Sequence, residues 1–360
     1  MLYLLPESAV LARWRSRVHP HTFDCYWSHL SKYLEFIGKG PDEAVAWADA
    51  LPKKHEVLDS IENYLRSRVG LRYKSQQFMY TTIRSFYMHN RVELPHDPGF
   101  HIRAEVAPVE RHLSLENVRE LVGLAVQPFR SMILTKCMGI LDTECLIYVS
   151  NHHAAVITEA LQKNLELVKL TLPGRKAKRN IRPFYTFIGD DALESIRSYF
   201  DRERGWPKKD EPIWMYRNTQ RPVSKIGFSF AWIALCRKAG LIPKEHTPDR
   251  RTRYGFNPHN TRNLTISTLN TVAGLNPKAI EFWAGHDIDP LGYNQFYSTS
   301  PQYVEDQYRL AMPYLNLLSG TTADPQETGK LREKVAELET AVKALQAMSD
   351  YRIATASAPK

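Results

Sequence analysis

The segment YGFNPHNTRNLTISTLNTVAGLNPKAIEFWAGHDIDPLGYNQFY, residues 254–297, concentrates side chains that can act on a phosphodiester. It places His259 and Arg262 ahead of His286 and ends in a group of tyrosines. An arginine can bind two non-bridging phosphate oxygens through its planar fork, histidines can move protons near neutral pH, and a tyrosine hydroxyl can attack phosphorus. The segment therefore predicts a phosphodiester-cleaving site that needs no metal and no other cofactor.

The spacing of His259 and Arg262 places both on one face of a helix, where both can reach one phosphate. Leu264, Ile266 and Leu269 follow at apolar positions, so the sequence predicts that the motif opens a helix. An HxxR pattern occurs in many helices, and by itself it identifies no function.

The composition is that of an ordinary globular chain with a basic balance. The 360 residues are 43% hydrophobic and 24% charged, and the length favours about two domains. The net charge of +9 favours a polyanionic partner such as nucleic acid. No apolar run approaches the ~20 residues that span a membrane, and the four cysteines form no CxxC pair. We therefore expect a soluble, cytoplasmic protein with reduced thiols, no metal site and no membrane association.

Apolar residues at helical spacing over residues 22–87 predict an N-terminal helical bundle, with Thr22 as an N-cap. Basic residues in its second half flank Tyr73 and Tyr80 with few acids nearby, which suits a surface that lies along a phosphate backbone. A solvated helix face is the alternative explanation. The candidate DNA-binding residues of this part are Arg66, Arg68, Arg72, Lys74 and Arg84.

The middle of the chain changes from helical to extended periodicity. Ser114 is a good N-cap for a helix, whereas residues 165–172 and 181–187 are expected to form two strands around a turn. Helices are expected again at 192–200 and 228–236. The turn carries the densest positive charge of the chain, for which a mobile basic loop is the alternative explanation. Its candidate DNA-binding residues are Arg175, Arg179 and Arg182.

Three strings are more specific than these patterns: RYGFNPH at 253–259, GHDIDPLGYNQFY at 285–297 and MPYLNL at 312–317. Together they resemble the tyrosine recombinase, or phage integrase, family, and in particular its archaeal integrases. The resemblance extends over nearly the whole chain to residue 319. It implies a mainly α fold of the α+β class, in which a helical core-binding domain precedes a mostly helical catalytic domain with a small antiparallel sheet.

The resemblance also implies a domain organisation. Residues 1–92 are expected to form the DNA-binding core-binding domain, 93–110 the linker and 111–320 the catalytic domain. The tail 321–360 carries apolar residues at alternating spacings of four and three over 329–348, which predicts a short coiled-coil-like helix. A helix that packs back on its own domain is the alternative.

The family cleaves DNA with a tyrosine that follows the glycine–histidine motif. Tyr297 lies eleven residues after His286, and Tyr293 lies seven residues after it. Tyr297 is the preferred nucleophile because the residues after it match the family's spacing better, and Tyr293 is the alternative. Three later tyrosines fall at apolar-stripe spacing and are expected to be packing aromatics: Tyr303, Tyr308 and Tyr314.

The resemblance also implies roles for the residues of this chain that match the family's other catalytic motifs. Arg262 would clamp the scissile phosphate, His259 would donate a hydrogen bond or carry a proton, and His286 would donate to the phosphate. A lysine on the β-hairpin would protonate the leaving 5′-oxygen. Lys176 is the preferred candidate for this acid and Lys178 the alternative, because a shift of one pleat changes which side chain points at DNA.

One position departs from the family. The family's first arginine stands in a TGLRxxE string, and the matching string here is MGILDTE at 138–144. Leu141 occupies the arginine position, while Glu144 is kept. Losing one of two guanidinium clamps would cost on the order of 10²–10³ in rate unless another cation replaces it. Arg130 and Arg175 are the candidate replacements.

The resemblance implies a site-specific DNA recombinase or integrase of a mobile genetic element, which cleaves and rejoins double-stranded DNA through a 3′-phosphotyrosyl intermediate. It also implies a homotetramer on two DNA sites. Leu141 motivates an alternative, a catalytically silent DNA-binding relative that regulates or scaffolds a recombination site. A metal-dependent nuclease and an RNA-binding protein find little support, because the carboxylates do not cluster at ligand spacing and no RNP-type aromatic string is present.

Overall fold

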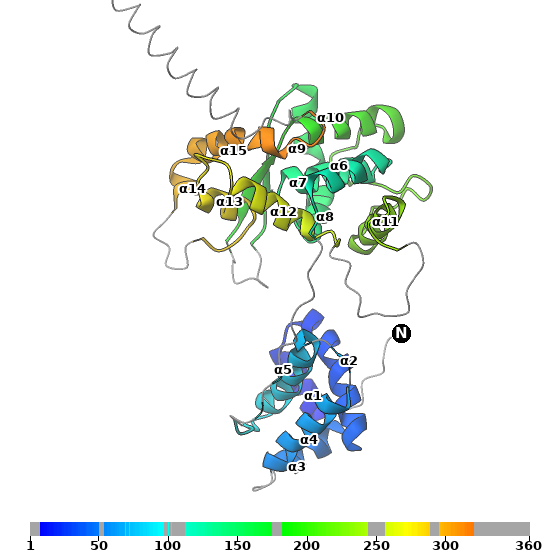
Figure 1. The fold of residues 1–360 in the computed structure, drawn as a ribbon, viewed down its shortest axis with the longest axis vertical. Coiled ribbons are helices and arrows are strands. Elements are labelled where there is room, and N and C mark those ends of the chain that lie inside the picture. The colour runs from blue at the N-terminus through cyan, green and yellow to red at the C-terminus, as the bar shows by residue number, and fades with distance from the viewer. Residues whose placement is uncertain are drawn as a thin grey trace, which may run out of the picture. The chain divides into compact units, whose positions relative to one another are not determined.

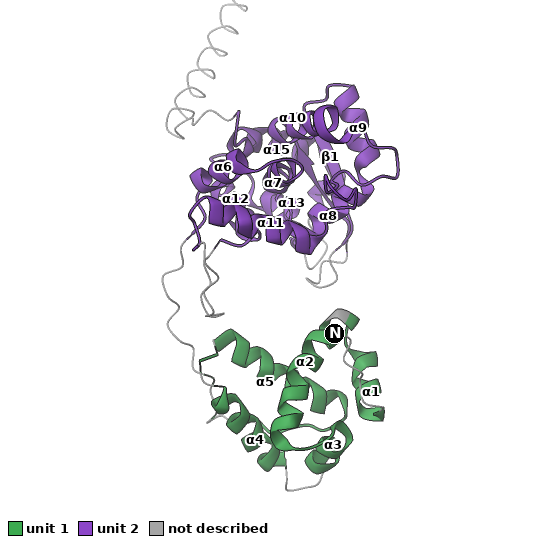
Figure 2. Cartoon of the chain, turned by 90° about the vertical axis from the view of Figure 1, so that its right-hand side faces the viewer, with its two compact units in different colours: residues 1–109, 249–252 green, residues 110–248, 253–360 purple. Residues whose placement is uncertain are grey.

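The computed structural model separates the chain into two compact units, one containing the described residues up to 102 and the other those from 112 onward (Figure 2). The structure describes residues 8–49, 54–68, 70–71, 73–96, 100, 102, 112–174, 182–243, 256–288 and 295–319. The predicted heptad helix at 329–348 lies outside them. Within these ranges, no helix is both long and apolar enough to cross a lipid bilayer.

The first unit is a helical bundle around an aromatic core. Trp14 is fully buried and packs edge-on against Phe23 and Phe86, with ring centroids 5.3 and 5.4 Å away, which ties three helices together. The predicted N-terminal bundle is therefore confirmed for the residues that are described. Its helices are α1 (Ala9–Arg17), α2 (Pro20–Ile37), α3 (Pro41–Asp49), α4 (Lys54–Ser67) and α5 (Tyr73–His89).

Helix α2 begins before the predicted cap at Thr22. Its first residue is Pro20, and His19 is the capping residue. Proline fits the first helical position because the N–H that it lacks would have no partner there, and its fixed φ is already helical. The prediction of Thr22 as the cap was wrong because Pro20 starts the helix earlier.

Part of the segment expected to be a linker packs on the first unit. Leu94 is buried in the core of this unit, and Phe100 and Ile102 pack against that core. Arg84 of α5 donates hydrogen bonds to the carbonyl oxygens of Leu94 at 2.8 Å and Pro95 at 3.0 Å. The chain therefore stays attached to the bundle beyond the end of α5.

The second unit packs helices around a central helix, α7, and a small sheet (Figure 1). Every residue of α7 from Ser131 to Met138 is buried, as expected for a helix with neighbours on all sides. Its helices are α6 (Leu115–Leu124), α7 (Phe129–Met138), α8 (Thr143–His152), α9 (Ala154–Gln162), α10 (Asp190–Tyr199), α11 (Lys225–Lys238), α12 (Asn260–Leu269), α13 (Pro277–Trp283), α14 (Phe296–Thr299) and α15 (Pro301–Leu315), with a π-helical turn at Phe200–Arg204.

The sheet consists of two antiparallel strands, β1 (Val168–Leu172) and β2 (Phe184–Ile188). Val168 pairs with Ile188 and Leu172 with Phe184. Strand β1 alternates buried and exposed residues, whereas β2 is buried throughout. The two predicted strands and the mainly α fold class with a small antiparallel sheet are thus confirmed.

Helix starts in the second unit follow local sequence signals. The Ser114 hydroxyl accepts a hydrogen bond from the Asn117 amide at 3.2 Å, and the Asn117 side chain accepts one from the Ser114 amide at 3.1 Å. This capping box confirms the predicted start of α6. Helix α12 begins at Asn260 with His259 as its capping residue, so the HxxR motif opens a helix as predicted.

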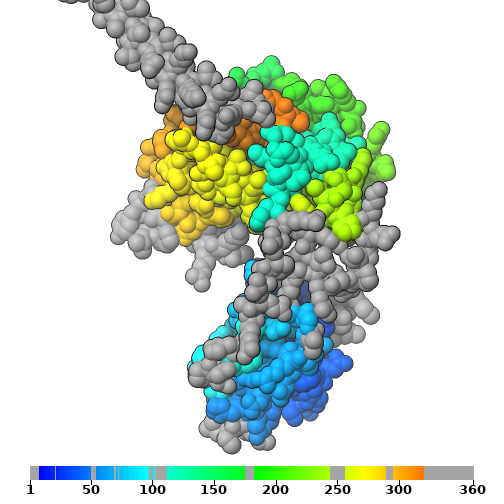
Figure 3. Space-filling view, in the orientation of Figure 1, coloured from blue at the N-terminus to red at the C-terminus, as the bar shows by residue number. Residues whose placement is uncertain are grey.

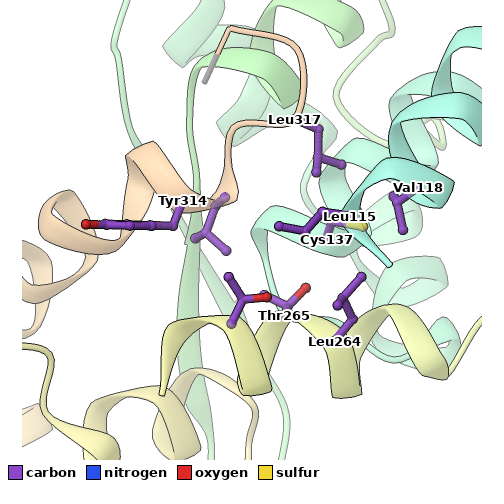
Figure 4. A pocket seen from close by; sticks show the side chains of 9 residues that line it. Leu115, Val118, Cys137, Leu264, Thr265, Tyr314 and Leu317 are labelled. Carbon is purple, nitrogen blue, oxygen red and sulfur yellow. The ribbon is translucent and has the colours of Figure 1, made fainter. Parts of the chain in front are cut away.

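Helix α12 is held in place by apolar packing on α6, α7 and the end of α15. Leu264 and Thr265 line a small apolar pocket together with Cys137 of α7 and Leu317 (Figure 4). On the surface, residues of α12 and α13, in yellow, lie against residues of the α6 region, in turquoise (Figure 3). This packing fixes the rotation of α12 and therefore the direction in which Arg262 projects.

The three tyrosines expected to pack differ in burial. Tyr308 is fully buried, and its hydroxyl donates to the carbonyl oxygen of Met138 at 2.9 Å. Tyr314 is partly buried against the same core. Tyr303 is 40% exposed, and its hydroxyl accepts a hydrogen bond from the Asn276 side chain at 3.2 Å. Tyr303 also packs edge-on against Phe296, with ring centroids 6.2 Å apart, so its ring packs as predicted but is more exposed than the other two.

The cysteines provide a test of this packing. Cys25 is exposed and the other three cysteines are buried, and burial raises the pKa of Cys137 and of Cys236 to about 12. Because the thiolate is the reactive form, we expect iodoacetamide to modify Cys25 alone in the native protein and all four thiols in denaturant, measured by intact mass. The matched variant Cys25→Ser should not react when native. Rapid native labelling of that variant would contradict the described core.

Candidate functional site

The motif residues converge from separate elements of the second unit. Arg262 lies on α12, His286 follows α13 and Tyr297 lies in α14. His286 and Tyr297 line one surface pocket together with Arg182, just before β2, and Phe282 of α13. Residues far apart in the sequence therefore meet at one place.

Arg262 is the buried centre of this arrangement, with 2% of its surface exposed. Its Nη1 donates to the carbonyl oxygen of Ile140 at 3.4 Å, and its Nη2 donates to the carbonyl oxygen of Ala284. Nη2 also lies 2.8 Å from Nε2 of His286. Burial lowers the pKa of the guanidinium, although an arginine in a protein stays charged. The guanidinium thus ties the turn before α8 to the end of α13.

These contacts decide the tautomer of His286. The Arg262 guanidinium can only donate, so the Nε2 atom that it contacts must accept. The ring proton is then on Nδ1, which contacts the Oε2 atom of Glu281. Donation from Nε2 to a phosphate, the role expected for His286, therefore requires this nitrogen to leave Arg262 and gain a proton.

Position 285, the first residue of the glycine–histidine motif, requires a glycine for two reasons: its backbone conformation and the close approach of Phe184. Its φ is +67°, in the left-handed region, and a Cβ there would lie 2.5 Å from Cζ of Phe184. A glycine therefore lets the ring of a β2 residue pack directly against the turn that carries His286. This contact between Phe184 and Gly285 holds strand β2 against the turn that carries His286.

Tyr297 is held by three aromatic or charged side chains. Its ring stacks on Phe282, with centroids 4.7 Å apart and planes at 13°. Its carbonyl oxygen accepts a hydrogen bond from the Tyr185 hydroxyl at 2.7 Å, and its own hydroxyl lies 3.4 Å from Nη1 of Arg182. Sequence reasoning missed Tyr185, Phe282 and Glu281, because two buried aromatics and one helical acid carry no local signal of a role.

His259 and Arg262 differ in environment despite their helical spacing. His259 is exposed at the start of α12, where its amide donates to the Asn257 side chain at 2.9 Å, while Arg262 is buried one turn later. Several candidates lie outside the described residues, so their roles stay predictions: Lys176, Lys178, Tyr293, Arg72, Arg175 and Arg179. In the part of the chain that is described, no group of three or more His, Cys, Asp or Glu could hold a metal ion.

Leu141, the residue that we expect at the position of the tyrosine recombinases' first arginine, belongs to the core. It is 1% exposed, and its Cγ would lie 2.8 Å from a Cβ added at Gly139. Ile140 before it has a φ of +53°, an uncommon conformation for a β-branched residue. The carbonyl oxygen of Leu141 accepts a hydrogen bond from Nζ of the fully buried Lys136. The turn at 139–142 thus places an apolar side chain inward at this position.

Arg130, suggested as a replacement for the family's first arginine, is bound to backbone carbonyls instead. Its Nε donates to the carbonyl oxygen of Val122 and its Nη2 to that of Gly123, both at 3.1 Å. These are carbonyls of the last turn of α6, which have no partner inside the helix. Arg130 therefore caps α6, and the suggestion that it replaces the first arginine was wrong.

The basic residues of the first unit divide into two groups. Arg66 and Lys74 are exposed, and the guanidinium of Arg68 lies over the ring of Tyr64 at 4.8 Å. Arg84 is instead hydrogen-bonded to the segment that follows α5. Arg84 therefore has a structural role within the first unit, and its contact with DNA stays a prediction, as do those of the other three.

No protein-family model and no curated protein matches this chain. Among solved structures the chain is similar to XerA recombinase, with 17% identity and a TM-score of 0.36 over 82% of this chain and 97% of that one. It is also similar to the integrase of transposon Tn1549 in complex with transposon right end DNA, with 14% identity and a TM-score of 0.45 over 83% of this chain and 99% of that one. At these identities and TM-scores the similarity adds no argument about function, which we draw from the side chains.

Substitution of Gly285 tests the contact between β2 and the site. Gly285→Ala forces a Cβ into the left-handed region, which costs about 1–2 kcal/mol, and against Phe184, which costs roughly a further 1–3 kcal/mol. Gly240→Ala is the matched control, since Gly240 has a φ of +68° and open space around its Cβ. We expect denaturant unfolding to show the larger loss for Gly285→Ala. Equal losses would contradict the contact with Phe184.

The His286 tautomer is measurable directly. We expect ¹⁵N NMR of the neutral ring to show a protonated Nδ1 in the native protein, because Glu281 accepts from this atom and Arg262 donates to Nε2. Glu281→Ala should raise the population protonated on Nε2, whereas Glu281→Gln keeps an oxygen acceptor and should retain the native tautomer. A native ring protonated on Nε2 would disprove the assignment.

Proposed function

We propose that this protein is a site-specific DNA recombinase or integrase that breaks and rejoins duplex DNA through a 3′-phosphotyrosyl intermediate. The observation that carries the proposal is the meeting of Tyr297, His286 and Arg182 in one pocket, with Arg262 in contact with His286. A hydroxyl nucleophile, a proton carrier and guanidinium groups are the components that metal-independent phosphodiester cleavage requires.

In the proposed reaction, Oη of Tyr297 attacks the scissile phosphorus and loses its proton to a neighbouring base or water. A P–Oη bond forms, the P–O5′ bond breaks, and the leaving 5′-oxygen gains a proton from Lys176, or from Lys178 as the alternative. One phosphodiester is exchanged for another, so no nucleotide cofactor is needed. Attack by a partner strand's 5′-hydroxyl on the phosphotyrosine reverses these steps and restores the backbone.

The burial of Arg262 affects how strongly its guanidinium can stabilise charge on a bound phosphate. A guanidinium away from water stabilises charge on phosphate oxygens more strongly than an exposed one. In the structure Nη1 donates to Ile140 and Nη2 to Ala284 and His286, so a bound phosphate would take the other N–H groups or replace one of these acceptors. His286 is the side-chain member of this set, and its departure would free both Arg262 and its own Nε2 for the phosphate.

The proposed partner is double-stranded DNA. The net charge of +9 and the exposed Arg66, Lys74 and Arg182 supply cations for backbone phosphates. By resemblance to tyrosine recombinases, we propose residues 1–92 as the core-binding domain, 111–320 as the catalytic domain and a homotetramer on two DNA sites as the active assembly.

A catalytically silent DNA-binding relative is the second candidate. Two observations favour it: Leu141 is buried where the family has an arginine, and Arg262 is hydrogen-bonded within the protein. This candidate binds DNA in a salt-dependent way and forms no covalent adduct. Leu141→Arg is not a suitable test between the two functions, because a guanidinium at a core position would be buried without a designed partner and would destabilise the fold.

Covalent capture of DNA tests the proposal. A library of nicked duplexes lets the cleaved fragment diffuse away, which traps the intermediate. We expect wild-type protein to retain DNA through a denaturing wash, and Tyr297→Phe to retain it only through a mild wash, because it keeps the ring but loses the nucleophilic oxygen.

Tyr303→Phe is the matched control, because it removes a partly exposed phenol on the next helix and should keep the adduct. Full covalent capture by Tyr297→Phe would disprove the nucleophile assignment and make Tyr293 the candidate. Binding without any adduct in the wild type would establish the silent relative.

A further inference from the structure

The reaction proposed above needs more than one cation at the phosphate, and Leu141 leaves one position without a cation. We propose that Arg182 is the second guanidinium at the reacting phosphate. This inference rests on the proposed recombinase function and assigns Arg182 a catalytic contact beyond general DNA binding.

Cations close to Leu141 in the structure are engaged in holding the backbone. Lys136 is fully buried and donates to the carbonyl oxygen of Leu141, and Arg262 donates to that of Ile140. Arg130 is occupied at the end of α6. Each of these three described cations is therefore held by backbone carbonyl oxygens, and none of them replaces the arginine expected at the position of Leu141.

Arg182 differs from them because it is exposed beside the candidate nucleophile. Its Nη1 lies 3.4 Å from the Tyr297 hydroxyl, and it lines the same pocket as His286. A phosphorus positioned for attack lies about 3–3.5 Å from the attacking oxygen. A guanidinium that already reaches Oη can therefore also reach the non-bridging oxygens on that phosphorus.

The backbone beside Arg182 is anchored to the site, although its side chain lies at the surface. Two residues later, the ring of Phe184 packs against Gly285. One residue further, the Tyr185 hydroxyl donates to the carbonyl oxygen of Tyr297. Strand β2 thus fixes the point from which Arg182 extends relative to both His286 and Tyr297, which is the preorganisation that a phosphate clamp requires.

Two guanidinium groups match the negative charge that develops on the phosphate. A phosphodiester carries one negative charge, and negative charge builds up on its non-bridging oxygens as Oη adds to phosphorus. Arg262 supplies one guanidinium from α12, and Arg182 supplies the other from the start of β2. The planar fork of each can donate two hydrogen bonds to phosphate oxygens, which a lysine cannot reproduce.

The test compares adduct formation on two forms of one substrate. The probe is a nicked duplex captured by the wild-type protein, with its scissile position mapped from the adduct. One form keeps the normal phosphate and the other carries a methylphosphonate, which replaces a charged oxygen with a methyl group. The variants are Arg182→Ala and Arg182→Lys. Arg202→Ala is the control because Arg202 is exposed in the same unit, outside the pocket.

On the normal phosphate we expect Arg182→Ala to slow adduct formation by about 10²–10³-fold and Arg182→Lys by less, with Arg202→Ala unchanged. On the methylphosphonate, Arg182→Ala should match the wild type, because the charge that the guanidinium neutralises is gone. Thermal unfolding should show that Arg182→Ala is folded.

Wild-type rates for Arg182→Ala on the normal phosphate would overturn the inference. An equal defect on both substrates would also overturn it, because it would indicate DNA positioning rather than a phosphate clamp. An absence of any adduct with the wild type would instead overturn the proposed function, and the inference with it.

Discussion

The described site depends on one buried guanidinium. Arg262 is almost inaccessible to solvent, and a buried charge is stable only when polar partners replace the water that it has lost. Its partners here are carbonyl oxygens of two separate segments and a histidine nitrogen. The turn before α8, the end of α13 and His286 are consequently held at fixed positions around α12. These same contacts occupy part of the guanidinium that would bind a phosphate in the reaction that we propose.

The turn at 139–142 carries Leu141, the residue that we expect at the position of the tyrosine recombinases' first arginine. An apolar side chain fills the inward position, while the carbonyl oxygens of Ile140 and Leu141 accept hydrogen bonds from Arg262 and Lys136. The backbone, rather than a side chain of the turn, interacts with both cations. In the reaction that we propose, a second guanidinium would come from another part of the fold, and Arg182, just before β2, lies beside Tyr297.

Local sequence signals correctly predicted those features of the fold whose physical cause lies within a few neighbouring residues. The capping box at Ser114, the alternation along β1 and the start of α12 are all properties of neighbouring residues, and all were predictable. Predictions about single side chains were less successful. Arg84 and Arg130 both looked available for phosphate, but each is hydrogen-bonded to backbone carbonyls of a neighbouring segment.

The sequence by itself determined the helical and strand segments, because periodicity is a local property of the chain, and its resemblance to tyrosine recombinase motifs singled out His259, Arg262, His286 and Tyr297. Only the tertiary structure decided which of these residues meet. It placed Arg262 in the interior and His259 at the surface, and it brought the β2 region to Tyr297 through the contact of Phe184 with Gly285. Contacts between residues a hundred positions apart depend on how helices and strands pack, and no local pattern records that packing.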